Sequence, residues 1–370
     1  MKALDIDILL YEVSHDSTLF QSEYLSLIYS FNHDIQALLA YPGGKKKMEV
    51  DLNDIFNNYL TKHNHYNTYI DGFFGMGGSF RALNDSLYSH GVRNIIVNEI
   101  NPCISRMHEN IRNSPQDMIN YFLEFVRTEI LIPHKKLYIS VNQMLKIKKI
   151  MKKRFYSLQK EEKFGVETST LMIMLSAFNY SGIVNFKKDG TISFGTPIYE
   201  SGDMDDFFYK TIKRINTYSH LYNKFEMKFF NSDYLTLYKH YKKEPNTLWN
   251  IDPVYLEESQ RKYTQEEILN LEDSHFVGCG INYSKKIFNH RGVLESLKDI
   301  DFIYNNNIHP LLHHYIKKFS LESKPFIRKE TAGSQKGKKV KEVEESTLYQ
   351  NNYNKSANNL ITSKPSQKCA

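Results

Sequence analysis

The sequence predicts a mixed α/β fold with a parallel central sheet, and three segments support this prediction. The first is an apolar strand that runs into a glycine-rich turn, NTYIDGFFGMGGSF. The second is a further apolar strand, RNIIVNEINP, and the third runs from KFFNSDYL through TLWNIDPVYL to HFVGCGINYS. Short apolar strands that alternate with helical segments are typical of parallel sheets covered by helices. At 370 residues, the chain is long enough for one large domain of this kind with an inserted module.

Changes of pattern along the chain divide it into five predicted parts. Residues 1–38 form an N-terminal extension with one amphipathic helix, and residues 39–114 carry the glycine-rich turn and the second strand. Residues 115–225 are mainly helical and contain a β-hairpin, NFKKDGTISF, in which KKDG is the turn. Residues 226–350 form the second α/β stretch. Residues 351–370 are polar and aperiodic, so we expect a disordered tail.

Composition and charge exclude several classes of protein. The chain has 48 Lys and Arg against 42 Asp and Glu, and this net charge of +6 suits a polyanionic partner without demonstrating one. Neither the three cysteines nor the 14 histidines have the spacing of metal ligands. No apolar run is long enough for a membrane span, and the N-terminus has acids where a signal peptide needs bases. We therefore expect a soluble intracellular protein without a metal.

The glycine-rich turn and the end of the second strand together predict a nucleoside site. Gly75 and Gly77 follow the first strand directly and allow the backbone to approach a ligand closely. Glu99 ends the second strand about 20 residues further on, where a carboxylate can accept both hydroxyls of a ribose. For the glycines alone, an ordinary tight turn between a strand and a helix remains the alternative.

The segment WNIDPVY, residues 249–255, is an apolar strand that ends in a carboxylate, a proline and an aromatic residue. In isolation it is best interpreted as a strand that stops at a proline turn. The same residues also suit methylation of the N6 amine of adenine, a poor nucleophile because its lone pair is delocalised into the ring. Asp252 and the carbonyl of Pro253 can accept the hydrogens of this amine, while Tyr255 stacks on a base flipped out of the duplex. This chemistry requires neither a metal nor a covalent intermediate.

In order and spacing, these motifs resemble those of the Dam-like (D12 class) DNA adenine-N6 methyltransferases over residues 41–349. The segment YPGGK is similar to the opening motif of the family, FFGMG to its cofactor loop, and NSDY to a segment that binds the adenine of the cofactor. The resemblance implies a Rossmann-like sheet that binds S-adenosyl-L-methionine. The implied cofactor-binding residues are Tyr41, Lys45, Asp71, Phe73, Gly75, Gly77, Glu99, Asp233 and Asp252. Asp233 has an alternative role as the N-cap of a helix.

The resemblance also assigns the hairpin to target recognition. The residues it places against DNA are Ser181, Ile183, Asn185, Lys187 and Lys188. Asn185 stands where the family has an arginine that reads guanine. The guanidinium of arginine donates two hydrogen bonds to guanine, and asparagine cannot reproduce this geometry. We therefore do not expect recognition of GATC in the manner of the family. A solvated hairpin is the alternative, and the basic run KIKKIMKKRF is similarly either a solvated helix face or a DNA contact.

Two departures from the family pattern concern the catalytic segment. Val254 replaces the second proline of the family's D-P-P-Y motif, which removes a restriction on the backbone of Pro253 and predicts weaker preorganisation. The connection from Tyr255 to an expected strand at HFVGCGIN is also short, which predicts that one face of the sheet is less covered.

Because of Val254, a catalytically degenerate DNA-binding protein is the alternative to an active enzyme.

The activity that the resemblance implies is site-specific methylation of adenine N6 in double-stranded DNA. N4-cytosine methylation is the less favoured alternative, because related enzymes usually have serine at the position of Asp252. We expect a monomer without a membrane or metal partner, in the cytoplasm of a bacterium or a phage-infected cell.

Overall fold

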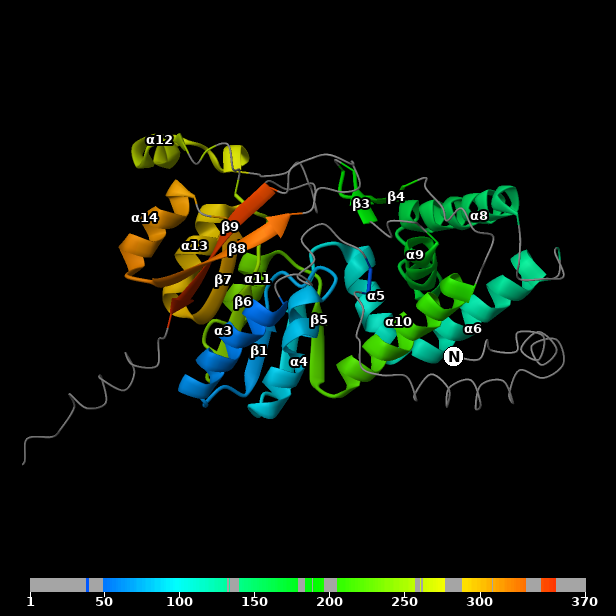
Figure 1. The fold of residues 1–370 in the computed structure, drawn as a ribbon, viewed down its shortest axis with the longest axis horizontal. Helices are drawn as coiled ribbons and strands as arrows, with labels where there is room; N and C mark the ends of the chain where they lie inside the picture. Colours follow the sequence, from blue (N-terminus) through cyan, green and yellow to red (C-terminus); the bar gives the residue numbers. More distant parts are fainter. Residues whose placement is uncertain are drawn as a thin grey trace, which may run out of the picture.

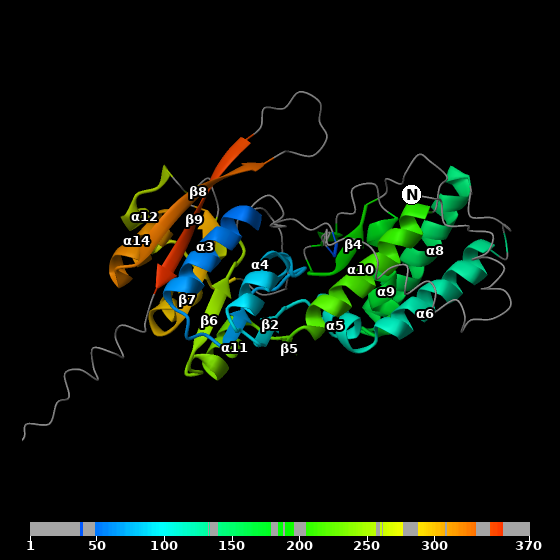
Figure 2. The same ribbon diagram turned by 60° about the horizontal axis from the view of Figure 1, so that its bottom comes forward.

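The computed structural model places a twisted sheet and its helices at one end of the molecule and a helical module with a small hairpin at the other (Figures 1 and 2). The structure describes residues 38–39, 49–131, 133, 140–178, 184–187, 189–195, 205–256, 260, 262–276, 288–307, 309–330 and 341–350. The expected N-terminal helix and the expected disordered tail lie outside these residues. Within the described ranges, no helix is long and apolar enough to cross a membrane.

The large sheet has the strand order β5-β2-β1-β6-β7-β9-β8. Its strands are β1 (Thr68–Asp71), β2 (Asn94–Asn98), β5 (Glu226–Phe230), β6 (Thr247–Ile251), β7 (Asp301–Asn307), β8 (Glu322–Glu330) and β9 (Lys341–Gln350). The first five strands in that order are parallel, and β9 runs antiparallel to both β7 and β8. This arrangement confirms the predicted mixed α/β fold with a Rossmann-like parallel sheet.

The central strands bury side chains on both faces of this sheet. Tyr69 and Leu248 belong to one apolar cluster, whereas Ile70 and Trp249, the next residues along β1 and β6, belong to a second cluster. Successive residues of a strand point to opposite faces, so the two clusters are two layers beneath helices. Because both faces are covered, the strands are continuously apolar rather than alternating.

Helices from separate parts of the chain form these two layers. The first cluster includes side chains of α3 (Glu49–Lys62) and α4 (Gly78–Ser89). The second includes side chains of α11 (Tyr234–Tyr241), α13 (His290–Ser296) and α14 (Pro310–Phe319). This pattern is the usual way in which a parallel sheet excludes water from both of its faces.

The helical module contains α5 (Pro102–Asn113), α6 (Pro115–Val126), η2 (Arg127–Leu131), α8 (Val141–Lys160), α9 (Val166–Ala177) and α10 (Asp205–Asn223). Ten consecutive residues of α9, from Thr168 to Ala177, are buried because α5, α6, α8 and α10 surround this helix. The hairpin of β3 (Val184–Phe186) and β4 (Ile192–Phe194) pairs antiparallel, as the sequence predicts. The boundaries of the five parts of the chain stay a prediction.

The strand expected at HFVGCGINYS is wrong for the residues of this run that the structure describes. His275 and Phe276 of HFVGCGINYS belong to the 3-10 helix η4 (Asp273–Phe276), and the strand beside β6 is β7. Phe276 is buried in the helical layer, so its apolar character fills this layer rather than the sheet. The expectation of a short connection is therefore also wrong. The chain passes through α12 (Gln265–Asn270), η4, α13 and η5 (Leu297–Asp299) before it reaches β7.

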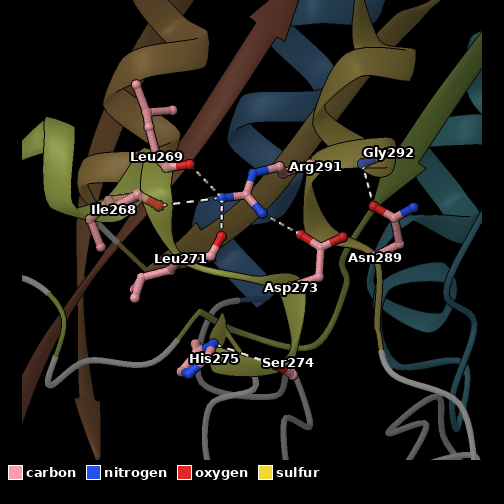
Figure 3. Close-up of polar contacts among 9 residues, drawn as sticks. All are labelled: Ile268, Leu269, Leu271, Asp273, Ser274, His275, Asn289, Arg291 and Gly292. Atoms are coloured by element: carbon pink, nitrogen blue, oxygen red, sulfur yellow. Dashed lines mark hydrogen bonds and ion pairs between the residues drawn. The ribbon is translucent and has the colours of Figure 1, made fainter.

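A single arginine holds this helical connection together (Figure 3). The guanidinium of Arg291, on α13, donates to the backbone carbonyls of Ile268, Leu269 and Leu271 at the end of α12. It also forms an ion pair of 2.9 Å with Asp273. The last carbonyls of a helix have no partner within the helix, so Arg291 satisfies these acceptors and fixes α12 against α13.

Candidate active site

Four carboxylates from distant parts of the sequence follow neighbouring strands of the sheet. Asp71 ends β1, Glu99 follows β2, Asp233 follows β5, and Asp252 follows β6. Since these strands are parallel and adjacent, their carboxyl ends lie along one edge of the sheet. The structure thus brings together carboxylates from the two α/β stretches of the sequence.

The glycine-rich turn forms a tight loop between β1 and α4. The N–H of Phe74 donates to the carbonyl of Asn98, and the N–H of Gly77 donates to the carbonyl of Phe74. Gly75 and Gly77 have φ angles of 52° and 69°, a region that glycine adopts without strain. A Cβ atom on Gly77 would also lie 3.1 Å from the ring of Phe74. Both the backbone angles and the close packing therefore require glycine at this position.

Glu99 closes the loop through its carboxylate. One carboxylate oxygen accepts from the N–H of Gly75 at 3.0 Å, and the other accepts from the N–H of Asn101 at 2.7 Å. Burial raises the pKa of Glu99 to about 7, with a smaller contribution from the charge of Asp71 and against the opposing effect of the two backbone N–H groups. The carboxyl group is therefore poised to titrate near neutral pH.

Asp71 connects β1 with β6 beneath the loop. Its carboxylate accepts from the N–H of Phe73 at 3.2 Å, from the amide of Asn250 at 3.1 Å and from the hydroxyl of Tyr69 at 3.3 Å. Burial raises the pKa of Asp71 to about 7, and the negative charge of Asp252 adds to this effect. Asp71 and Asp252 follow the paired strands β1 and β6, so their carboxyl groups belong to the same edge of the sheet.

Asp233 occupies the N-cap position of α11. Its two carboxylate oxygens accept from Thr236, one from the backbone N–H at 3.1 Å and the other from the hydroxyl at 2.6 Å. The capping role that the sequence left open is therefore present. A contact between Asp233 and a cofactor stays a prediction.

The segment at residues 252–255 is anchored to the neighbouring strand β7 by a residue that sequence reasoning missed. Pro253 is buried, whereas Asp252, Val254 and Tyr255 are half-buried. The backbone N–H of Leu256, directly after this segment, donates to Asn306 Oδ1 at 3.0 Å. Asn306 lies on β7 and is itself buried. The only sequence signal for this role is the run of three asparagines at the end of an apolar strand.

His108 supports the glycine loop from α5 and was also missed. Its Nε2 lies 2.8 Å from the carbonyl of Gly75, and its Nδ1 lies 2.7 Å from the hydroxyl of Tyr222 on α10. Burial lowers the pKa of His108 to about 4, so the ring is neutral at physiological pH. Because a carbonyl can only accept, we assign the proton to Nε2 and the acceptor to Nδ1.

The hairpin rests on α8 beside the sheet edge. Gln159 of α8 bonds to both the carbonyl and the N–H of Ile192, at 3.2 and 2.8 Å. Asn185 is exposed on β3, and Lys187 is exposed where the turn begins. The remaining predicted site residues lie outside the described part of the chain: Tyr41, Lys45, Ser181, Ile183 and Lys188.

A glycine loop and an acidic residue at the carboxyl edge of a parallel sheet define the class of Rossmann-like nucleoside-binding enzymes. Residues 41–277, more than half of the chain, match the family model of the D12 class N6 adenine-specific DNA methyltransferases. The chain belongs to this family, which confirms the resemblance and the expectation of an adenine-specific DNA methyltransferase. A search of curated proteins finds no match. In the described ranges, no three His, Cys, Asp or Glu side chains form a potential metal site.

We expect the free protein to lose stability as Glu99 ionises. The ordinary pKa of the carboxyl group is 4.5, and burial raises it to about 7 in the folded protein. Folding therefore favours the neutral acid. This contribution is complete below the ordinary pKa and is lost as the pH rises through the folded one. At about 1.4 kcal/mol per pKa unit, the free energy of unfolding falls by on the order of 3 kcal/mol.

Urea denaturation between about pH 5 and pH 8 measures this loss. Glu99→Gln should reduce the dependence of the unfolding free energy on pH, because the amide does not ionise. Glu244→Gln, at an exposed position, provides the matched control and should keep the dependence of the original protein. If Glu99→Gln left the pH dependence unchanged, Glu99 would not be the titrating group.

Proposed function

We propose that the protein transfers a methyl group from S-adenosyl-L-methionine to N6 of an adenine flipped out of double-stranded DNA, at a specific sequence. The observation that carries this proposal is the position of Glu99 and Asp252 on one edge of the sheet. Glu99 is bonded to the glycine loop, and the segment that contains Asp252 is anchored to Asn306. Family membership supports the adenine and the DNA. The donor, the flipped base and the sequence specificity are our inference.

The glycine loop fits a nucleoside cofactor. Gly75 and Gly77 adopt positive φ angles that let the chain turn tightly at the carboxyl end of β1, where folds of this kind bind a nucleoside. Glu99 keeps further lone pairs on both oxygens beyond those that meet Gly75 and Asn101, and these can accept from ribose hydroxyls. When bound, S-adenosyl-L-methionine supplies the electrophilic methyl group. The proposal includes Tyr41, Lys45, Asp71, Phe73 and Asp233 as further cofactor contacts.

The catalytic segment fits the amine. In this proposal the carboxylate of Asp252 and the carbonyl of Pro253 accept the hydrogens of N6, which draws the nitrogen toward tetrahedral geometry and frees its lone pair. The half-buried ring of Tyr255 offers a surface on which the flipped base stacks. The site therefore orients the amine and removes its proton, and both effects lower the barrier to methyl transfer.

The segment around Val254 has support from another residue. A second proline would have restricted the backbone of the residue before it. In this chain the bond from Leu256 to the buried Asn306 anchors the segment one residue beyond Tyr255. This anchor favours an active enzyme over a degenerate DNA-binding protein. Methyl transfer distinguishes the enzyme from the degenerate protein, because the degenerate protein would bind cofactor and DNA without turnover.

Asp252→Asn should lower the rate of methyl transfer at least about 100-fold, because the amide is a much weaker acceptor than the carboxylate. Binding of DNA should remain, since Asp252 acts on the amine rather than on phosphates. Transfer of labelled methyl groups to duplex DNA gives the rate, and a filter-binding assay gives the affinity. Asp85→Asn changes a side chain that is 86% exposed and serves as the matched control. A comparable rate in Asp252→Asn would show that another group accepts the proton.

The exposed side chains of the hairpin fit target recognition. Lys187→Ala should weaken binding to every DNA sequence alike and reduce the salt slope by about 0.9. Asn185→Ala should instead relax preference at one base pair by about 1 to 3 kcal/mol, because asparagine pairs with adenine through two hydrogen bonds. Lys243→Ala changes an exposed lysine of the sheet domain and is the control. Methylation mapped strictly to GATC and unaffected by Asn185→Ala would refute this role of the hairpin.

A further inference from the structure

Asn101 contacts both the hairpin turn and the carboxylate at the end of β2. Its side-chain Nδ2 donates to the carbonyl of Gly190, in the hairpin turn, at 3.0 Å. Its backbone N–H donates to Glu99 at 2.7 Å. Its Oδ1 accepts from the N–H groups of Cys103 and Ile104 and so caps α5. The residue is 5% exposed, and all three groups are therefore held in a protected environment.

The hairpin turn that Asn101 contacts is itself well defined. The N–H of Gly190 donates to the carbonyl of Lys187, and the N–H of Lys187 donates to the carbonyl of Thr191, both at 2.9 Å. Asp189 accepts from both the N–H and the hydroxyl of Thr191. These bonds connect Lys187, Gly190 and Thr191, so the carbonyl of Gly190 belongs to the same hydrogen-bonded turn as Lys187.

The same path continues through the glycine loop to the helical module. Glu99 accepts from the N–H of Gly75, and the carbonyl of Gly75 accepts from His108. His108 in turn accepts from Tyr222 of α10. Hydrogen bonds thus connect the hairpin turn, the end of β2, the glycine loop and α10 without interruption. Each link is buried or partly buried, where hydrogen bonds are electrostatically stronger than in water.

We propose that Asn101 is a positioning residue that couples docking of DNA on the hairpin to binding of the cofactor at Glu99. The inference rests on the proposed function of the hairpin and of Glu99. When DNA holds the hairpin, the bond to Gly190 holds Asn101, and Asn101 holds the carboxylate in the orientation that accepts a ribose. DNA therefore increases the affinity for the cofactor. By thermodynamic reciprocity, the cofactor increases the affinity for DNA by the same factor.

The test separates this coupling from the capping role of Asn101. Serine is an equally good N-cap, but its hydroxyl is too short to reach the carbonyl of Gly190. Asn101→Ser should therefore fold and lose the link to the hairpin. Asn101→Asp keeps both the cap and the side-chain length but replaces the amide donor with a charged acceptor, so it provides a second variant. Asn110→Ser is the matched control on α5, since the amide of Asn110 bonds to Ser169 of α9 rather than to the hairpin.

The measurement is the affinity for S-adenosylhomocysteine by calorimetry, with the full chain alone and with saturating sheared double-stranded DNA. The coupling factor is the ratio of the two affinities within each protein, so a general change in affinity does not affect it. We expect DNA to increase the affinity of the original protein roughly 5- to 150-fold. We expect a factor near one in Asn101→Ser and Asn101→Asp, and the original factor in Asn110→Ser.

Three results would overturn the inference while leaving the proposed function in place. The first is a coupling factor near one in the original protein, and the second is an undiminished factor in both Asn101 variants. A loss of coupling in Asn110→Ser equal to that in the Asn101 variants would likewise overturn the assignment to Asn101. Failure of the original protein to bind S-adenosylhomocysteine at all would instead overturn the proposed function, and the inference with it.

Discussion

The site depends on the two hydrogen bonds that the buried carboxylate of Glu99 accepts from backbone N–H groups. These bonds join the glycine loop after β1 to the start of α5 after β2, and Gly75 and Glu99 are 24 residues apart along the chain. A buried carboxylate is costly unless it is hydrogen-bonded, so the loop and the carboxylate stabilise each other. Loss of either partner would release Gly75, and with it the support that His108 gives from the opposite side.

The sheet edge concentrates negative charge in a poorly solvated region. Burial raises the pKa values of both Asp71 and Glu99 to about 7, with contributions from the charge of Asp252 at Asp71 and from the charge of Asp71 at Glu99. A cluster of carboxylates that is costly in the free protein is a favourable environment for a positively charged ligand. The electrostatics of the edge therefore support the proposed cofactor, whose sulfonium and amino groups are cationic.

Much of the fold and part of the site could be predicted from the sequence because the signals are local. The glycine loop, Glu99 at a strand end, and the turn of the hairpin each depend on residues close together in the chain. The strand expected at HFVGCGIN was wrong in its described residues because an apolar residue such as Phe276 fits a buried helical layer as well as a strand. Only the pairing of β6 with β7 distinguishes the two, and pairing is a property of the whole sheet.

The supporting residues of the site could not be predicted for a different reason. Asn306 bonds to a residue 50 positions away, and His108 bonds to Tyr222 at a separation of 114 positions. Asparagine and histidine have many possible roles, and their own sequence neighbourhoods do not identify such distant partners. Asp233 is an intermediate case: the sequence identified it as either a cap or a cofactor contact, and the geometry shows the cap.

The central claim is that this sheet edge methylates adenine N6 in DNA. Sequencing of DNA from cells that express the protein, with detection of modified bases, tests it most directly because it reports the activity, the base and the sequence context together. We expect N6-methyladenine in one defined context, and unmodified DNA in cells that express Asp252→Asn at the same level. Expression of the folded protein without any modified adenine, or with N4-methylcytosine instead, would contradict it.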